Sequence, residues 1–111
     1  MVEDIESIKK SLIDRLRELN PDQVILFGSQ AEGNADEDSD IDLYVVTKDP
    51  SLPSNYAEKR ELVRSVSRHI YDLREKIGMD LLVHTKAMHR LFSQHNSSFA
   101  RDLKERGERI L

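Results

Sequence analysis

The sequence predicts an α/β fold, a small mixed β-sheet of three or four strands with helices packed on one face. Its 111 residues leave room for only one hydrophobic core. Amphipathic helical segments alternate with short apolar segments rich in β-branched residues, and no linker, repeat or low-complexity tract separates them. We therefore expect residues 1–111 to form a single domain, with any functional site built on a compact sheet.

The first half of the chain predicts one helix and two strands. Residues 3–19 place apolar side chains at helical spacing with charges between them, and Pro21 stops this helix because proline cannot continue it. Residues 24–27 form a short apolar strand, and residues 40–47 form a second strand rich in β-branched side chains. Both strands are expected to be central in the sheet.

The second half predicts a long helix, a third strand and two shorter helices. Residues 56–77 carry an apolar stripe at helical spacing, and residues 79–85 follow as an apolar strand. Helical segments are expected at about 86–94 and 97–106. The short tail after Gly107 can add a strand at the edge of the sheet.

Composition excludes several classes of function. The formal net charge of −4 and the pI near 5.5 disfavour a long nucleic acid as substrate, because proteins that hold many phosphates usually present a basic face. The chain has no cysteine, which excludes disulfides, thiolate zinc sites and cysteine nucleophiles. No apolar run approaches the roughly 20 residues that span a bilayer, and no signal-like leader opens the chain. We expect a cytoplasmic protein that is not embedded in a membrane.

Two acids stand one residue apart on the second predicted strand. Asp40 and Asp42 point to the same face, about 6.5–7 Å apart, because side chains alternate along a strand. Ile41 and Leu43 then turn to the core. Two parallel carboxylates can hold a pair of cations roughly 3.5–4 Å apart if one of them bridges, and Mg²⁺ prefers such oxygen donors. By itself an acidic run such as residues 36–42 is more typical of a solvated loop, so the interpretation depends on its surroundings.

A glycine and a serine follow the first predicted strand. A turn at Gly28-Ser29 presents backbone N–H groups toward an anion, and glycine lets the chain approach a phosphate closely. Such a pair is common at the ends of strands and helices, so alone it is weak evidence. Its significance comes from its spacing, because ten residues separate Ser29 from Asp40.

A known superfamily carries the same pattern of a Gly-Ser pair, ten residues and Asp-x-Asp. The sequence resembles it with Gly-Ser at 28–29 and Asp-Ile-Asp at 40–42. The superfamily is that of the DNA polymerase β-like nucleotidyltransferases. The short chain, the Phe-Gly-Ser at 27–29 and the Asp-Ser-Asp-Ile-Asp-Leu at 38–43 are most similar to its minimal nucleotidyltransferase (MNT) branch, and the resemblance covers nearly the whole chain.

The resemblance implies the polymerase β-like nucleotidyltransferase fold and gives roles to five residues. Asp40 and Asp42 would bind a pair of Mg²⁺ ions, and Asp80, from a later strand, would ligate the catalytic ion or help to deprotonate the acceptor. Gly28 and Ser29 would hold the triphosphate of ATP or another NTP. From the residues alone, Asp80 also fits an exposed acid at the start of a strand.

The resemblance also implies the reaction and the partner. An acceptor hydroxyl would attack the α-phosphorus of the NTP and release pyrophosphate. Members of the MNT branch that are paired with HEPN-domain toxins modify a protein hydroxyl, so this chain would be the antitoxin of a toxin–antitoxin system. Separately, the small size of the domain and the exposed side of its sheet predict a homo- or hetero-oligomer, because so short a domain lacks an acceptor-binding half.

Two alternatives to this function stay open. One is an enzyme acting on a small hydroxylated molecule such as an aminoglycoside, although those relatives carry an extra acceptor domain that 111 residues do not accommodate. The other is a non-catalytic binding module of the same fold. Glu32 is the reason to consider the non-catalytic alternative, because many members of the family carry a basic residue at that position.

The histidines give no metal-binding pattern. His84, His89 and His95 are separated by five and six residues, unlike the i, i+4 pair of a helical metal site. We expect solvated or interface side chains at these positions.

Overall fold

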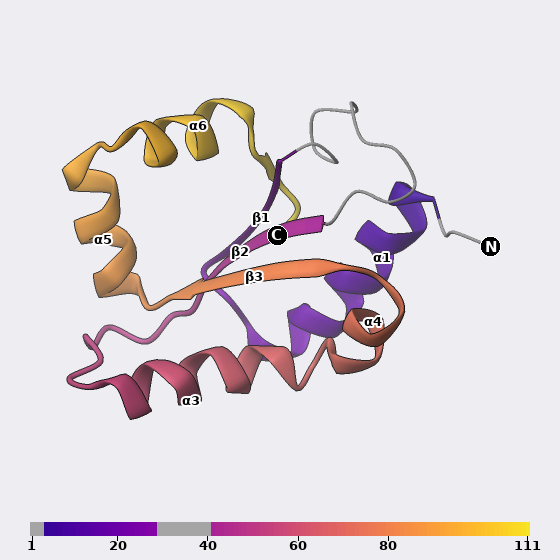
Figure 1. Cartoon of the computed structure of the whole chain (residues 1–111), viewed down its shortest axis with the longest axis horizontal. Coiled ribbons are helices and arrows are strands. Elements are labelled where there is room, and N and C mark those ends of the chain that lie inside the picture. The colour runs from indigo at the N-terminus through magenta and orange to yellow at the C-terminus, as the bar shows by residue number, and fades with distance from the viewer. Residues whose placement is uncertain (1–3, 29–40) are drawn as a thin grey trace.

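The protein folds around a four-stranded mixed sheet (Figure 1), and the computed structural model describes residues 4–28 and 41–111. The strand order is β3-β2-β1-β4. Strand β1 is antiparallel to both β2 and β4, and β2 is parallel to β3. In chain order the strands are β1 (Gln23–Phe27), β2 (Ile41–Val46), β3 (Met79–His84) and β4 (Glu108–Arg109). The predicted mixed sheet, its central β1 and β2 and its edge strand β4 are confirmed.

Helices precede and follow the strands, and most of them start with a capping side chain. The oxygens of Asp4, Asn55, Thr85 and Ser97 each accept a hydrogen bond from a backbone N–H three residues later, which satisfies a group that the helix itself leaves unpaired. The helices are α1 (Ile5–Leu16) with a 3₁₀ turn at Arg17–Leu19, α3 (Tyr56–Ser67), α4 (Tyr71–Lys76), α5 (Lys86–His95) and α6 (Ser98–Arg106).

The larger core lies between one face of the sheet and helices α1, α3 and α4. Figure 1 shows α3 and α4 below β3. Alternate residues of the strands point to this face, as the two-residue repeat of a strand requires. Ile41 and Leu43 turn to this core as predicted and are fully buried. The buried members of this core are Ile8, Leu12, Leu16, Val24, Leu26, Ile41, Leu43, Val45, Val66, Ile70, Leu73, Met79 and Val83.

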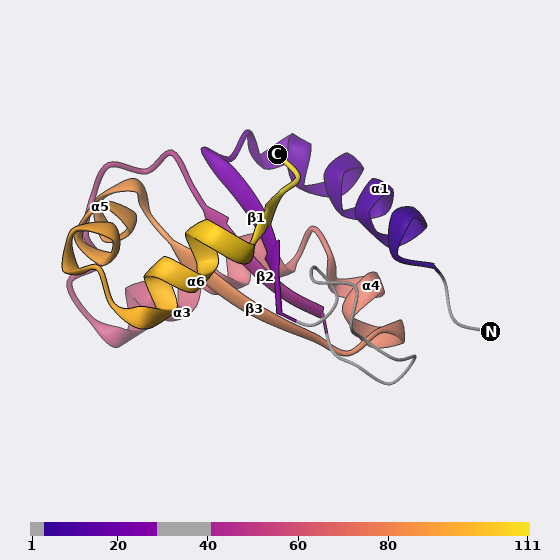
Figure 2. The ribbon, with the colours of Figure 1, turned by 90° about the horizontal axis from the view of Figure 1, so that it is seen from above.

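The opposite face of the sheet has a smaller core formed with α5 and α6. Tyr44, Val46 and Leu103 are buried there, with Phe92 of α5 packed against them. Figure 2 shows α6 in front of the strands and leading into β4. Helices therefore pack against both faces of the sheet, whereas the sequence predicted them on one face.

The predicted helix over residues 56–77 is wrong in one respect, because the structure divides it into α3 and α4. The backbone of Ile70 leaves the helical region, with φ −124° and ψ 16°, while its side chain is fully buried. Val66, Ile70 and Leu73 all reach the same core. The apolar stripe therefore continues across the break, and periodicity alone could not reveal it.

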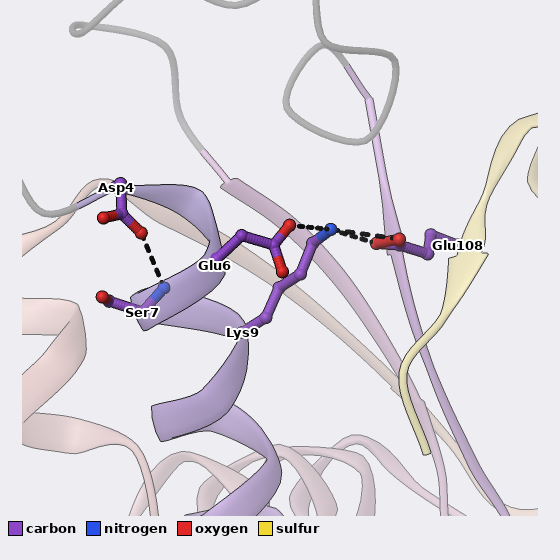
Figure 3. A network of polar contacts seen from close by, with 5 residues as sticks. All are labelled: Asp4, Glu6, Ser7, Lys9 and Glu108. Carbon is purple, nitrogen blue, oxygen red and sulfur yellow. Dashed lines mark hydrogen bonds and ion pairs between the residues drawn. The ribbon is translucent and has the colours of Figure 1, made fainter.

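A polar contact joins the two ends of the described chain (Figure 3). The ammonium of Lys9 on α1 lies 3.2 Å from a carboxylate oxygen of Glu6 and 2.5 Å from one of Glu108 on β4. The hydrogen bond to Glu108 raises the pKa of Lys9 above its usual value. Backbone hydrogen bonds also join the chain after β4 to β1, since the N–H of Ile110 donates to the carbonyl of Val24 at 2.8 Å. Within residues 4–28 and 41–111, no helix is both long and apolar enough to cross a bilayer.

Candidate active site

Two predicted site residues, Asp42 and Asp80, lie side by side on neighbouring parallel strands. Each is the second residue of its strand, and the two are direct partners in the register of β2 and β3. Paired residues project to the same face, and neighbouring strands lie about 4.8 Å apart. Asp42 is half-buried and Asp80 is exposed. The two carboxylates therefore share one end of the sheet face that also carries Tyr44.

Gly28 completes this end of the sheet from β1. It follows Phe27, which is the antiparallel partner of Asp42, and it adopts a φ of +82°, in the region that favours glycine. The Asp42 carboxylate lies where a side chain on Gly28 would begin, with its Cγ 3.1 Å from the position of such a Cβ. Both the backbone conformation and the close approach of Asp42 therefore require glycine here.

Three residues of the predicted site lie outside the described residues: Ser29, Glu32 and Asp40. The described part of the chain contains no cluster of three or more potential metal ligands, because it holds only Asp42 and Asp80 of the expected three. Paired carboxylate oxygens on one sheet face are nevertheless the hard donors that Mg²⁺ selects. The residues present fit a magnesium site.

A second polar cluster, Tyr44 with His84 and His89, lies farther along the same face. The Tyr44 side chain is fully buried, and its hydroxyl lies 2.8 Å from the Nδ1 atom of each histidine. One hydroxyl hydrogen can serve only one of these nitrogens, so the other nitrogen must donate to the tyrosine oxygen. The amide of Gln23 lies 3.1 Å from Nε2 of His89 and can donate to it. This places the hydrogen of His89 on Nδ1 and makes His84 the acceptor.

Burial controls the acid–base behaviour of this cluster. It raises the pKa of Tyr44, so the phenol stays protonated near neutral pH. Burial also lowers the pKa of His84, with a smaller contribution from the neighbouring His89. The pKa of His89 is lowered by burial too, against an opposing contribution from Asp22. All three groups are therefore neutral at pH 7.

The sequence interpretation missed this cluster. His84 and His89 are half-buried and bonded to Tyr44, in place of the solvated or interface positions expected for them, whereas His95 is exposed. Strand alternation could have predicted part of this cluster, because His84 is four residues after Asp80 and therefore lies on the same face of the sheet. The contact with Tyr44 is 40 residues away in sequence, so local spacing does not show it.

A small mixed α/β sheet with paired aspartates beside a strand-end glycine is the arrangement of a nucleotidyl-transfer domain. The chain belongs to the nucleotidyltransferase domain family, which it matches over residues 8–92. This range contains Gly28, Asp42 and Asp80 together with the first three strands of the sheet. The family resemblance inferred from the sequence is confirmed, and the protein is an enzyme of the nucleotidyltransferase class.

Individual relatives agree with this assignment. A protein of Methanocaldococcus jannaschii named as a candidate protein adenylyltransferase is 34% identical over 89 residues, which are 79% of this chain and 83% of the relative. A crystal structure of a toxin–antitoxin with AMP-PNP has a TM-score of 0.55 at 19% identity, over 93% of this chain and 72% of that one. A candidate nucleotidyltransferase from Sulfolobus solfataricus has a TM-score of 0.57 at 19% identity, over 96% of this chain and 78% of that one. The two structures support the fold.

Proposed function

We propose that this enzyme transfers AMP from ATP, in a Mg²⁺-dependent reaction, to a hydroxyl of a partner protein, and that it acts as the antitoxin of a toxin–antitoxin pair. The observation that carries this proposal is the register of Asp42 with Asp80 beside Gly28. The name of the M. jannaschii relative supports a protein as the acceptor. The toxin–antitoxin structure with AMP-PNP supports ATP as the donor and a toxin as the partner. That the toxin is of the HEPN type is part of the proposal and comes from the resemblance of the sequence to the MNT branch.

The residues of the site would divide the work as follows. Gly28 and Ser29 hold the triphosphate through backbone N–H groups, since no side chain at Gly28 blocks its approach. Asp40, Asp42 and Asp80 would hold two Mg²⁺ ions. When bound, Mg²⁺ neutralises phosphate charge and lowers the pKa of the attacking hydroxyl.

The transfer itself makes one bond and breaks one. The acceptor oxygen attacks the α-phosphorus of ATP, and the bond from this phosphorus to the oxygen that bridges to the β-phosphate breaks. Pyrophosphate leaves with the bridging oxygen. Asp80, which is exposed, would take the proton of the acceptor hydroxyl, directly or through water.

The experiment that tests this function is transfer of label from α-labelled ATP, with magnesium, to the protein encoded by the adjacent gene. Asp42→Asn removes one ligand charge and should reduce transfer by at least about 100-fold, in the range found for losing a group that stabilises the charge of a transition state. Asp14→Asn makes the same change of charge at an exposed position on α1 and serves as the matched control. Chelation of the divalent ions should abolish transfer by the native chain and by the Asp14→Asn control.

The non-catalytic alternative gives a different result in the same assay. A chain that neutralises its partner by contact alone would form a stable complex without labelling it, and Asp42→Asn would leave the complex intact. That outcome would replace the enzymatic antitoxin with a binding antitoxin of the same fold.

A further inference from the structure

A small cavity lies beside Gly28, between the end of β1 and helix α6. Its volume is about 190 Å³, which is below the roughly 300–1,000 Å³ of pockets that enclose a drug-sized ligand. It can therefore take a part of a nucleotide but not the whole. The cavity is lined by Phe27, Gly28, Phe99, Asp102, Leu103 and Arg106.

Two aromatic rings form the apolar side of this cavity. The rings of Phe27 and Phe99 meet edge to face, with centroids 5.6 Å apart and planes at 80°. Phe99 also contacts Phe92 at 5.8 Å, so its ring is held from two sides. Even so, the Phe99 side chain remains 45% exposed. A positioned phenyl ring with this much free surface can pack against another flat ring.

The polar side of the cavity comes from the last two turns of α6. Asp102 supplies carboxylate acceptors there and Arg106 supplies guanidinium donors. Leu103 also lines the cavity and is itself buried. An apolar platform with donors and acceptors at its edge suits a heteroaromatic ring that carries polar groups on its rim.

The cavity shares a wall with the reaction site. Gly28 lines it, and the Asp42 carboxylate lies close to the same glycine. Phe27 is the register partner of Asp42 and projects to the same face of the sheet. A nucleotide whose phosphates lie on the turn at Gly28 therefore has this cavity within reach of its other end.

We propose that Phe27 and Phe99 bind the nucleobase of the NTP substrate, with Phe99 as the residue that contributes most to its affinity. This assignment rests on the proposed function, because it takes the phosphates to be held at Gly28. The competing occupant of the cavity is a side chain of the partner protein.

The test compares binding of two magnesium complexes, those of ATP and of inorganic tripolyphosphate, by calorimetry with the full chain. Tripolyphosphate carries the phosphate contacts without a base. Phe99→Ala should weaken ATP binding roughly 5- to 100-fold, the range expected for losing one base–aromatic stack, and leave tripolyphosphate binding within about twofold of the native value. Leu91→Ala, at a position on α5 that is 54% exposed and outside the cavity, should change neither affinity.

A second variant separates base binding from a structural effect of the substitution. Phe99→Tyr keeps the flat ring and its contacts with Phe27 and Phe92, so it should retain ATP affinity close to that of the native chain. Equal losses of ATP and tripolyphosphate in Phe99→Ala would mean that the site is distorted and would overturn the assignment. Unchanged ATP affinity in Phe99→Ala, with labelling of the partner lost, would assign the cavity to the partner protein.

The native chain itself distinguishes failure of this inference from failure of the proposed function. If it binds neither ligand, the proposed nucleotidyl transfer fails and the base site fails with it. If it binds both ligands with equal affinity, the phosphate site stands and the base site is excluded.

Discussion

At the scale of single residues, position 28 has the clearest requirement for one residue type, glycine. Its φ of +82° and the carboxylate of Asp42 in the space of a Cβ are independent reasons for glycine. We predict that Gly28→Ala lowers the free energy of unfolding by about 1–3 kcal/mol, the usual cost of holding a non-glycine residue in such a conformation. It should also displace Asp42 and abolish transfer.

A double-mutant cycle measured by urea unfolding separates the two causes. In an Asp42→Ala background the carboxylate is gone, so the steric part of the cost disappears and the backbone part remains. Gly28→Ala should therefore cost less in that background than in the native chain. Equal costs in the two backgrounds would contradict the close approach of Asp42 to Gly28.

The acids show how far residue spacing can predict a site. The two-residue repeat of a strand placed Asp42 on one face, and the resemblance to the nucleotidyltransferases pointed to Asp80, which the register of β2 and β3 brings beside it. Which strands are neighbours is a long-range property of the fold, so spacing alone could not pair residues 38 positions apart. The roles of Asp42, Asp80 and Gly28 stay predictions. Those of Asp40, Ser29 and Glu32 do so too, and these three lie outside the described residues.

At the scale of elements, the Tyr44 cluster links β2, β3 and α5 through side chains that titrate. Burial lowers the pKa values of His84 and His89 below the usual histidine value of 6.5. Below that pH the unfolded chain therefore binds more protons than the folded one. The stability that the cluster contributes is therefore complete above pH 6.5 and is lost as the pH falls. Asp22, which pairs with Lys86 at 3.8 Å, raises the pKa of His89, but by less than burial lowers it.

We accordingly predict that the free energy of unfolding is lower at pH 5.5 than at pH 7.5, as measured by urea titration at each pH. Replacing His84 and His89 together by glutamine removes the titrating groups and leaves partners for the Tyr44 hydroxyl, so the difference between the two pH values should shrink. The exposed His95→Gln is the matched control and should leave the difference unchanged. A pH dependence that survives in the double variant would place its origin in other groups.

The elements also show which parts of the fold could not be predicted. The N-terminal helix, the strands and the C-terminal helices were found close to their bounds, because each carries its own periodicity and ends near a glycine, a proline or a capping residue. The break at Ile70 was missed, since its side chain continues the apolar stripe of α3. The packing of α5 was also missed, because it has no fully buried residue and contacts the sheet mainly through the rings of Phe92 and His89.

At the scale of the whole molecule, the larger core and the candidate site lie on opposite faces of the sheet. Helices α1, α3 and α4 bury the larger core on one face, while the other face carries the Tyr44 cluster, the cavity beside α6 and the aspartate pair. Contacts between Lys9 and Glu108 and between Val24 and Ile110 bring the C-terminal end of the chain against β1 and α1. Asp80 is exposed at one end of this second face.

The measurement that tests the central claim most directly is a comparison of α-labelled and γ-labelled ATP, with magnesium, in the presence of the partner protein. Nucleotidyl transfer at Asp42 and Asp80 predicts that the α-label appears on the partner while the γ-label leaves in pyrophosphate, and that Asp42→Asn abolishes the labelling but Asp14→Asn does not. Label from the γ-phosphate on the partner, or α-labelling that persists in Asp42→Asn, would contradict the account.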